Sequence, residues 1–399
     1  MSTCSRDVFQ TVNQFSLACS VPAMEFGTTP LHTELEKAVA KFVGKEAAIV
    51  YNMGYGTNAT SIPALMGQGT LILSDALNHT SLVNGSRTSG ATVGVFKHND
   101  PEHLAKVLRT KIAEGQPRTG RAWKKVWVLV EGIYSMEGEI LRLREIVDVV
   151  KKYKAYIYVD EAHSIGAIGK TGRGVCEYSG VDPSEIDILM GTFSKSFGGM
   201  GGYVAASKEI IAFIRCSSSG SAYDTGLSPV IVQQVLTALN IVAGWDSTDI
   251  GHKKITSLRE NSNYFRQKLL GMGVVTLGDF DSPVIPVMLY VLSKIADYSR
   301  ACLRRNLAIV SVAFPATPFL LSRVRFCISA AHTKEDLDEA LQTNKELSEE
   351  YRIRYNSHTC GYSSGSSPID FSSRQVSFRP RQCLQSINSP TWLHFDRVS

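Results

Sequence analysis

The sequence predicts an α/β fold, in which helices cover both faces of a largely parallel sheet and a smaller α/β domain follows. Two observations support this prediction. Short apolar runs alternate along the chain with segments whose apolar residues recur at helical spacing, and such alternation is typical of parallel sheets covered by helices. The chain also has 399 residues, of which 44% are hydrophobic and 20% charged, enough to bury one large and one smaller core.

The elements follow one another in a regular order. A first helix is expected over residues 31–43, because Leu31, Leu35, Val39 and Phe42 recur at helical spacing. Strands are expected at the short apolar runs 47–51, 71–73, 92–96, 126–130, 156–159, 186–190, 284–290 and 324–329. Further helices are expected over residues 104–112, 141–153, 228–243, 256–271 and 334–352.

This order of elements divides the chain into four parts. We expect residues 1–30 to be an N-terminal remnant, residues 31–245 a large domain and residues 246–355 a small C-terminal domain. Residues 356–399 are rich in Ser and show no sustained periodicity, so we expect a disordered tail without a part in catalysis.

Charge and cysteine content exclude several classes of function. The 42 basic and 37 acidic residues give a net charge of +5, too small and too dispersed to indicate a nucleic-acid partner. The eight cysteines show no Cys-x-x-Cys pair and no metal-ligand spacing, which indicates a reducing compartment and no metal site. Sequons at Asn58 and Asn78 are therefore expected to stay unglycosylated. Because no run of about 18 apolar residues occurs, the chain is expected to lack a membrane span and to be soluble.

Lys195 stands among hydroxyl residues and glycines in the stretch 191–199, directly after the apolar run 186–190. An amine at the end of a buried strand loses hydration, which lowers its pKa and makes it a nucleophile toward an aldehyde. Most lysines, however, are solvated surface charges, and many Gly-rich turns merely end strands. The stretch alone therefore leaves both interpretations open.

Asp160 supplies a second group at the same edge of the predicted sheet, because it follows the apolar run 156–159. Ligands of open α/β sheets bind beyond the carboxyl ends of the strands. A carboxylate there can keep the pyridine nitrogen of pyridoxal phosphate protonated, so that the ring accepts electrons from a carbanion. His163, three residues on, is within reach of the phenolic oxygen. The Gly-rich turn 54–58 offers exposed backbone amides for a phosphate.

Several motifs in register make the chain resemble the α-oxoamine synthase family of fold-type I pyridoxal-phosphate enzymes. They are Ser74–His79, Glu131–Gly138, Asp160–Gly166, Gly172–Gly174 and the lysine stretch 191–199. The resemblance extends from about Gly27 to about Tyr355. Within the family, the segments 314–318 and 325–333 are most similar to the lysine-bearing catalytic subunit of eukaryotic serine palmitoyltransferase.

The resemblance implies four catalytic residues in the large, cofactor-binding domain. Lys195 carries pyridoxal 5'-phosphate as a Schiff base and removes the α-proton of the substrate, while Asp160 holds the ring nitrogen protonated. His79 stacks on the ring, and His163 lies at its phenolic oxygen. No metal is implied.

The same resemblance implies the remaining contacts to cofactor and substrate. The other cofactor-binding residues are Ser135, Gly54, Tyr55, Thr192 and Thr225. Of these, Ser135 lies near the phenolic oxygen and the substrate, whereas Thr225 crosses the dimer interface to the phosphate of the neighbouring subunit. Arg325 pairs with the substrate carboxylate through its guanidinium fork. Arg323, on the same face of the same strand, remains a competitor for that role.

The implied activity is serine C-palmitoyltransferase. L-serine condenses with a long-chain acyl-CoA such as palmitoyl-CoA, carbon dioxide and coenzyme A leave, and 3-ketosphinganine forms as the first step of sphingolipid biosynthesis. The implied partner is the lysine-lacking long-chain base subunit 1, in a heterodimer at the cytosolic face of the endoplasmic reticulum membrane.

Two departures from the family pattern keep alternatives open. The Pro-Arg-Gly stretch that precedes Gly27 in relatives is absent, and so is an earlier Asn-Tyr-Leu-Gly segment. The chain is therefore also consistent with a truncated, non-catalytic or regulatory product that lacks its membrane anchor. A soluble α-oxoamine synthase that uses glycine or alanine is a third interpretation.

Overall fold

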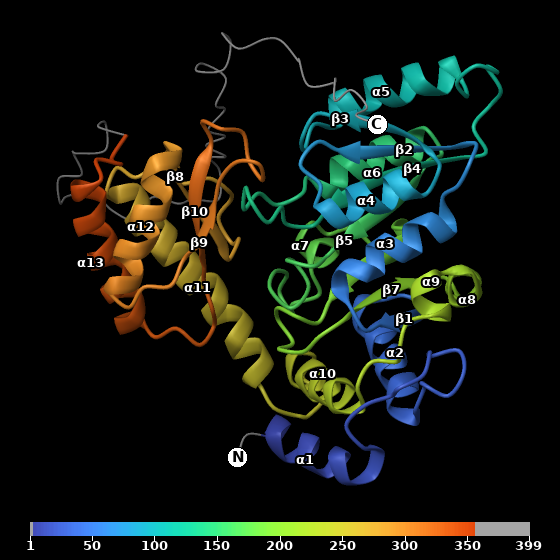
Figure 1. The fold of residues 1–399 in the computed structure, drawn as a ribbon, viewed down its shortest axis with the longest axis horizontal. Coiled ribbons are helices and arrows are strands. Elements are labelled where there is room, and N and C mark those ends of the chain that lie inside the picture. The colour runs from blue at the N-terminus through green and yellow to red at the C-terminus, as the bar shows by residue number, and fades with distance from the viewer. Residues whose placement is uncertain (1–2, 356–399) are drawn as a thin grey trace, which may run out of the picture. The chain divides into compact units, whose positions relative to one another are not determined.

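The structure is a computed structural model that describes residues 3–355. The predicted tail 356–399 lies outside the described residues. Within them, a large sheet and a small sheet are each covered by helices (Figure 1).

The large sheet of the described residues has seven strands in the order β1-β7-β6-β5-β4-β2-β3. Five neighbouring strands are parallel, from β6 to β3, whereas β7 and β1 run antiparallel at one edge. The strands are β1 (Ala47–Tyr51), β2 (Thr70–Asp75), β3 (Thr92–Phe96), β4 (Lys125–Glu131), β5 (Tyr156–Asp160), β6 (Ile188–Thr192) and β7 (Gly202–Ala206). The prediction of a largely parallel sheet in an α/β fold is confirmed.

Two hydrophobic cores lie on the two faces of this sheet, because successive residues of a strand point to opposite sides. In β4, Val128 and Val130 belong to one core and Trp127 and Leu129 to the other. Such strands are apolar on both faces, which explains the continuous apolar runs in the sequence. The helices of this part are α2 (Pro30–Val43), α3 (Gly54–Leu65), α4 (Thr80–Thr88), α5 (Pro101–Glu114), α6 (Leu143–Lys152), α7 (Val175–Tyr178), α8 (Lys208–Ser217), α9 (Ser219–Ala222) and α10 (Pro229–Val242), with a 3-10 turn at Pro183–Glu185.

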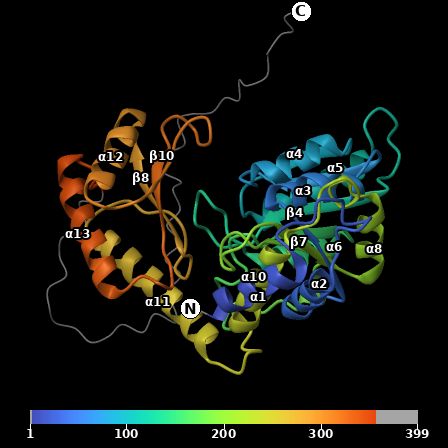
Figure 2. The ribbon, with the colours of Figure 1, turned by 60° about the horizontal axis from the view of Figure 1, so that its bottom comes forward.

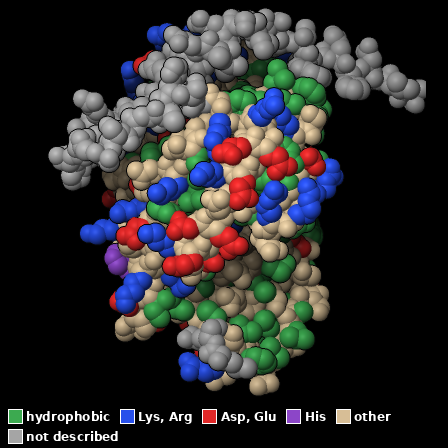
Figure 3. Space-filling view, turned by 90° about the vertical axis from the view of Figure 1, so that its left-hand side faces the viewer, with side chains coloured by type: hydrophobic (Ala, Val, Ile, Leu, Met, Phe, Trp, Pro, Cys, Tyr) green, Lys and Arg blue, Asp and Glu red, His purple; other side chains and the backbone are tan. Residues whose placement is uncertain are grey.

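The C-terminal part has its own sheet and its own core. Its strands pair in the antiparallel order β8-β10-β9. The elements are α11 (Ile250–Gly271), β8 (Val284–Tyr290), α12 (Leu292–Arg304), β9 (Val310–Val312), β10 (Ser322–Cys327) and α13 (Lys334–Glu350). In Figures 1 and 2, α11 runs from the end near α10 into this part of the molecule. Figure 3 views the molecule from this side, and Lys and Arg side chains are interspersed there with Asp and Glu.

The segment predicted as an N-terminal remnant contains a regular helix, α1 (Thr3–Phe15), which packs against α10 (Figures 1 and 2). The Thr237 hydroxyl donates a hydrogen bond of 2.9 Å to Oδ2 of Asp7, and the Ser228 hydroxyl donates to the Leu17 carbonyl. These bonds attach the segment to the large part of the fold. The division of the remaining chain at residues 245 and 246 stays a prediction.

Candidate active site

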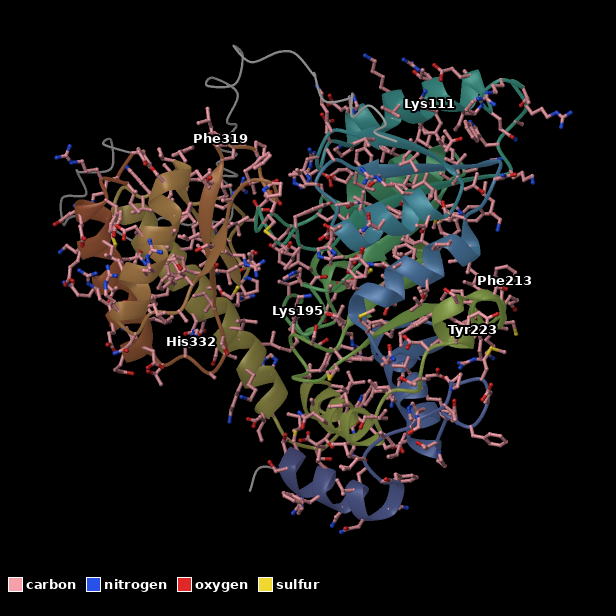
Figure 4. All side chains as sticks on the ribbon, viewed as in Figure 1. Lys111, Lys195, Phe213, Tyr223, Phe319 and His332 are labelled. Atoms are coloured by element: carbon pink, nitrogen blue, oxygen red, sulfur yellow. The ribbon has the colours of Figure 1, made fainter. Side chains whose placement is uncertain are left out.

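Three of the site residues predicted from the sequence lie where neighbouring parallel strands end. Asp160 is the last residue of β5 and Thr192 the last residue of β6, and these two strands are paired. Lys195 follows three residues after β6, at the side of the large sheet that faces the C-terminal part (Figure 4). The carboxyl ends of parallel strands are the usual position of ligand sites in such sheets.

The loop that carries Lys195 is anchored by aromatic residues. Phe193 and Phe197 are buried on either side of the lysine, with exposed fractions of 1% and 2%. The backbone also closes the loop, because Phe193 N donates to Gly201 O at 3.0 Å and Gly199 N donates to Phe193 O at 2.9 Å. The backbone that carries the lysine is therefore held in a fixed position.

The Lys195 amine has a pKa below its ordinary value. Loss of hydration is the main cause, and the positive charge of Arg325 adds to it, whereas the carboxylates of Asp160 and Glu131 oppose it. Solvent still reaches the side chain, and its one hydrogen bond among the described atoms is a long contact of 3.5 Å to Thr192 Oγ1. A lowered pKa and a weakly held amine suit a nucleophile and a base.

Asp160 is buried, with an exposed fraction of 4%, and both carboxylate oxygens accept hydrogen bonds. Asn58 Nδ2 donates to Oδ2 at 2.7 Å, and the Ala162 amide donates to Oδ1 at 2.9 Å. Asn58 is a residue that the sequence did not identify as part of the site. The only signal was its position in the Gly-rich turn, since the contact depends on where β5 ends.

Both predicted histidines have a lowered pKa and are therefore neutral near pH 7. Burial is the main cause at each ring, and the charge of Lys195 lowers both values further. His79 caps α4, where its Nδ1 contacts the Ser81 hydroxyl at 2.8 Å and accepts from the Ser81 amide at 3.2 Å. The charges of Lys195 and Arg325 and the ring of His79 all lie near enough to His163 to lower its pKa.

The first turn of α3 begins at Gly54 and Tyr55, as the phosphate prediction requires. The first amides of a helix have no carbonyl partner within it and favour an anion. A Cβ atom at Gly54 would lie 2.9 Å from Thr192 Cγ2, so only glycine lets the helix approach the end of β6 this closely. The Tyr55 ring contacts the His79 ring edge to face, at 6.4 Å between centroids.

The structure separates the two arginine candidates on β10. Arg323 is almost fully buried, and its guanidinium is already bound within the protein. Its NH1 nitrogen donates to Met136 O at 2.9 Å and to Glu137 Oε1 at 3.2 Å. Arg325 donates from its NH1 nitrogen to Ser135 O at 2.9 Å, while its Nε has no hydrogen-bond partner among the described atoms. An unpartnered guanidinium N–H close to Lys195 favours Arg325 as the group for a substrate carboxylate.

Thr225 lies apart from these residues. It is exposed, and its Oγ1 and backbone carbonyl accept from Asn52 Nδ2 at 3.3 and 3.1 Å. Its predicted contact to a neighbouring subunit stays a prediction. A separate hollow of about 510 Å³ lies between residues 167–170 and α11, and none of the predicted residues line it.

The residues present fit pyridoxal phosphate. The chain offers a weakly held amine, a buried carboxylate with two donors, neutral imidazoles and the start of a helix for the phosphate. Each corresponds to one functional group of that cofactor. In residues 3–355 no group of three or more His, Cys, Asp or Glu side chains is arranged to hold a metal ion.

Comparisons with known proteins identify related sequences. Residues 3–343 match the model of the family described as aminotransferase class I and II. The sequence is 56% identical over 352 residues to long chain base biosynthesis protein 2a of Oryza sativa subsp. japonica, covering 88% of this chain and 72% of that protein. It is 50% identical over 348 residues to serine palmitoyltransferase 2 of Dictyostelium discoideum, covering 87% of this chain and 71% of that one.

Solved structures show the same fold. A serine palmitoyltransferase with its pyridoxal phosphate internal aldimine superposes with a TM-score of 0.81 at 30% identity, covering 88% of this chain and 84% of that one. The serine palmitoyltransferase of Sphingomonas wittichii gives 0.82 at 29% identity, with coverage of 88% and 85%.

Proposed function

Because this chain belongs to the aminotransferase class I and II family, and within it to the long chain base biosynthesis protein 2 and serine palmitoyltransferase group, we propose that it is the lysine-bearing subunit of a serine C-palmitoyltransferase. Its cofactor is pyridoxal phosphate. The proposed reaction joins the α-carbon of L-serine to the acyl carbon of palmitoyl-CoA or a similar thioester. Coenzyme A and carbon dioxide leave, and 3-ketosphinganine is the product.

The residues of the chain divide the chemistry among them. Pyridoxal phosphate, when bound, supplies an electron-accepting ring for the electron pair left on the α-carbon. Lys195 removes the α-proton, and its lowered pKa increases the uncharged fraction of the amine that can do so. Asp160 holds the proton on the ring nitrogen, and neutral His163 lies at the phenolic oxygen. Arg325 holds the serine carboxylate with two parallel hydrogen bonds.

Further side chains orient the cofactor in this proposal. His79 covers one face of the ring and leaves the other face to Lys195. The phosphate lies at the start of α3, where Gly54 and Tyr55 supply backbone amides, and Thr192 and Ser135 complete the surroundings. Thr225 serves the phosphate of the neighbouring subunit.

One observation supports the proposal most strongly. An amine with a depressed pKa lies at the same edge of the large sheet as a buried carboxylate, and the charge of Arg325 on β10, whose Nε has no partner among the described atoms, reaches that amine, in a chain that is 56% identical to a long chain base biosynthesis protein.

The proposed assembly is a heterodimer with a lysine-lacking subunit 1 at the cytosolic face of the endoplasmic reticulum membrane. The similarity to serine palmitoyltransferase 2 supports this assembly. Among the helices of residues 3–355, none is long and apolar enough to cross a membrane.

The test is to express the full chain with a lysine-lacking subunit 1 and to measure 3-ketosphinganine formed from labelled L-serine and palmitoyl-CoA. Lys195→Ala should abolish product formation. Lys170→Ala, which changes an exposed lysine on another loop, should leave the rate unchanged. Product from the Lys195→Ala complex would refute the proposal, and so would faster condensation with glycine or alanine than with serine.

A further inference from the structure

A hydrogen-bonded chain connects two of the groups that contact the cofactor ring. Asn58 Nδ2 donates both to Asp160 Oδ2 at 2.7 Å and to Ser81 Oγ at 3.0 Å. Ser81 Oγ in turn contacts His79 Nδ1 at 2.8 Å. The Asp160 carboxylate, proposed to contact the ring nitrogen, and the His79 imidazole, proposed to cover the ring face, are therefore connected through the Asn58 amide and the Ser81 hydroxyl.

A third partner fixes the orientation of the Asn58 amide in this series of hydrogen bonds. The Tyr158 hydroxyl donates to Asn58 Oδ1 at 2.8 Å, which leaves the amide nitrogen to face Asp160 and Ser81. Asn58 and Tyr158 are fully enclosed, with exposed fractions of 1% and 0%. An amide in this position presents N–H groups to the carboxylate at every pH, because it does not titrate.

A donor at 2.7 Å matters more beside a buried carboxylate than in water. Hydrogen bonds to charged groups are stronger than neutral ones, and low local dielectric increases the difference. Without this donor, Asp160 would keep the Ala162 amide on its other oxygen only. Its Oδ2 would then lose its hydrogen-bond donor, and the carboxylate would be free to turn.

We propose that Asn58 is a positioning residue for pyridoxal phosphate, which holds the Asp160 carboxylate aimed at the ring nitrogen and connects it through Ser81 to His79. This inference rests on the proposed function only through the cofactor and does not depend on the identity of the acyl acceptor or donor. Neither the Gly-rich turn nor the sequon that begins at Asn58 indicates this role in the sequence.

The chain offers a matched control for a merely structural contribution. Asn344 on α13 is also buried, with an exposed fraction of 0%, and its Oδ1 accepts from the Tyr298 hydroxyl at 2.8 Å. It belongs to the C-terminal part rather than to the site. Asn344→Ala therefore reports what the loss of a buried asparagine–tyrosine bond does to the fold alone.

The test measures the dissociation constant of pyridoxal phosphate for the full chain by protein fluorescence between about pH 6 and about pH 9, together with the thermal midpoint. Asn58→Ala should raise the dissociation constant about 10- to 100-fold, because it removes a hydrogen bond to a charged group. Asn344→Ala should lower the thermal midpoint and leave the dissociation constant unchanged.

Asn58→Asp gives the sharper result, because it keeps the shape and the acceptor for Tyr158 but places a second carboxylate against Asp160. Two carboxylates at that distance share one proton at neutral pH. The cofactor affinity of Asn58→Asp relative to that of wild type should therefore fall about 10-fold or more as the pH rises through the range, because the ratio removes the titration of Lys195 that both proteins share.

Each alternative outcome is distinguishable. Equal dissociation constants for Asn58→Ala and Asn344→Ala, or the same pH profile for Asn58→Asp and wild type, would overturn the positioning role. Failure of the wild-type chain to bind pyridoxal phosphate would instead overturn the proposed function. If Asn58→Ala does not fold, the near-isosteric Asn58→Asp still decides the question.

Discussion

Arginines 323 and 325 lie two residues apart on one strand face, yet their substitution should have opposite effects. Arg325 has an unpartnered Nε and one hydrogen bond to the Ser135 carbonyl. Two charge-assisted hydrogen bonds to the serine carboxylate should contribute about 3 to 4 kcal/mol in total. Arg325→Ala should therefore raise the KM for serine about 100- to 1,000-fold, while the loss of one backbone contact lowers stability by about 1 kcal/mol.

Arg323→Ala should instead lower stability strongly and change the KM for serine little. Side-chain exposures of 4% for Arg323 and 11% for Glu137 show that the pair is buried, and removal of one member leaves an uncompensated charge. Such a loss typically lowers the free energy of unfolding by about 3 to 5 kcal/mol. Burial already raises the pKa of Glu137, which makes its charged form less favourable and places the expected value at the lower end of this range.

The assay combines urea unfolding of each variant with serine saturation kinetics of the complex that contains it. The structure requires a large KM effect with a small stability effect for Arg325→Ala, and a large stability effect for Arg323→Ala. An unchanged KM for Arg325→Ala would refute the reasoning. A KM increase of the same size in a fully stable Arg323→Ala variant would refute it as well.

Three further predictions concern other parts of the fold. Gly54→Ala should raise the dissociation constant of pyridoxal phosphate about 10-fold, measured by fluorescence titration, because the added methyl group would lie 2.9 Å from Thr192 Cγ2 and an imperfect fit costs about 1 to 3 kcal/mol. His98 contacts Asp75 at 2.8 Å, and its pKa is raised to about 10 because hydrogen bonds and nearby negative charge outweigh burial. The protonated His98 therefore contributes at most about 5 kcal/mol to the free energy of unfolding. This contribution is fully present below the unfolded-state pKa of about 6.5 and is lost as the pH rises through about 10. Urea midpoints of wild type and His98→Gln should therefore converge toward pH 10, and a constant gap would contradict the ion pair. Asp7→Ala should lower stability by about 1 kcal/mol by removing an acceptor between α1 and α10, and an unchanged unfolding midpoint would show that the contact contributes nothing.

The sequence predicted strands well where an unbroken apolar run marks them. β1 and β8 occupy the predicted residues, but β6 begins two residues later than expected. The reason is that Asp187 uses its carboxylate to accept from the Ile157 amide, so the apolar run begins before the strand. β7 was missed because Gly202–Ala206 is short and rich in small residues. It is nevertheless buried, since it pairs with β1 and β6 on either side.

The positions of some site residues could also be predicted from the sequence, whereas others could not. Lys195 and Asp160 could be predicted because they follow apolar runs, and strand ends meet at one edge of a parallel sheet. The roles of Arg323 and Arg325 could not be separated, because period-two geometry places both on the same face. Asn58 was not predicted for a related reason: its partner is set by the three-dimensional position of the end of β5, more than one hundred residues further along the chain.

The anchoring of the lysine loop also determines what a chain without the lysine would keep. Phe193 and Phe197 hold the loop from the core, whereas Lys195 contributes only a contact of 3.5 Å to Thr192 and stays accessible to solvent. A substitution at Lys195 should therefore remove the proposed chemistry without disturbing the core. A chain of this fold without the amine would keep the same core and the same surface for the assembly proposed above.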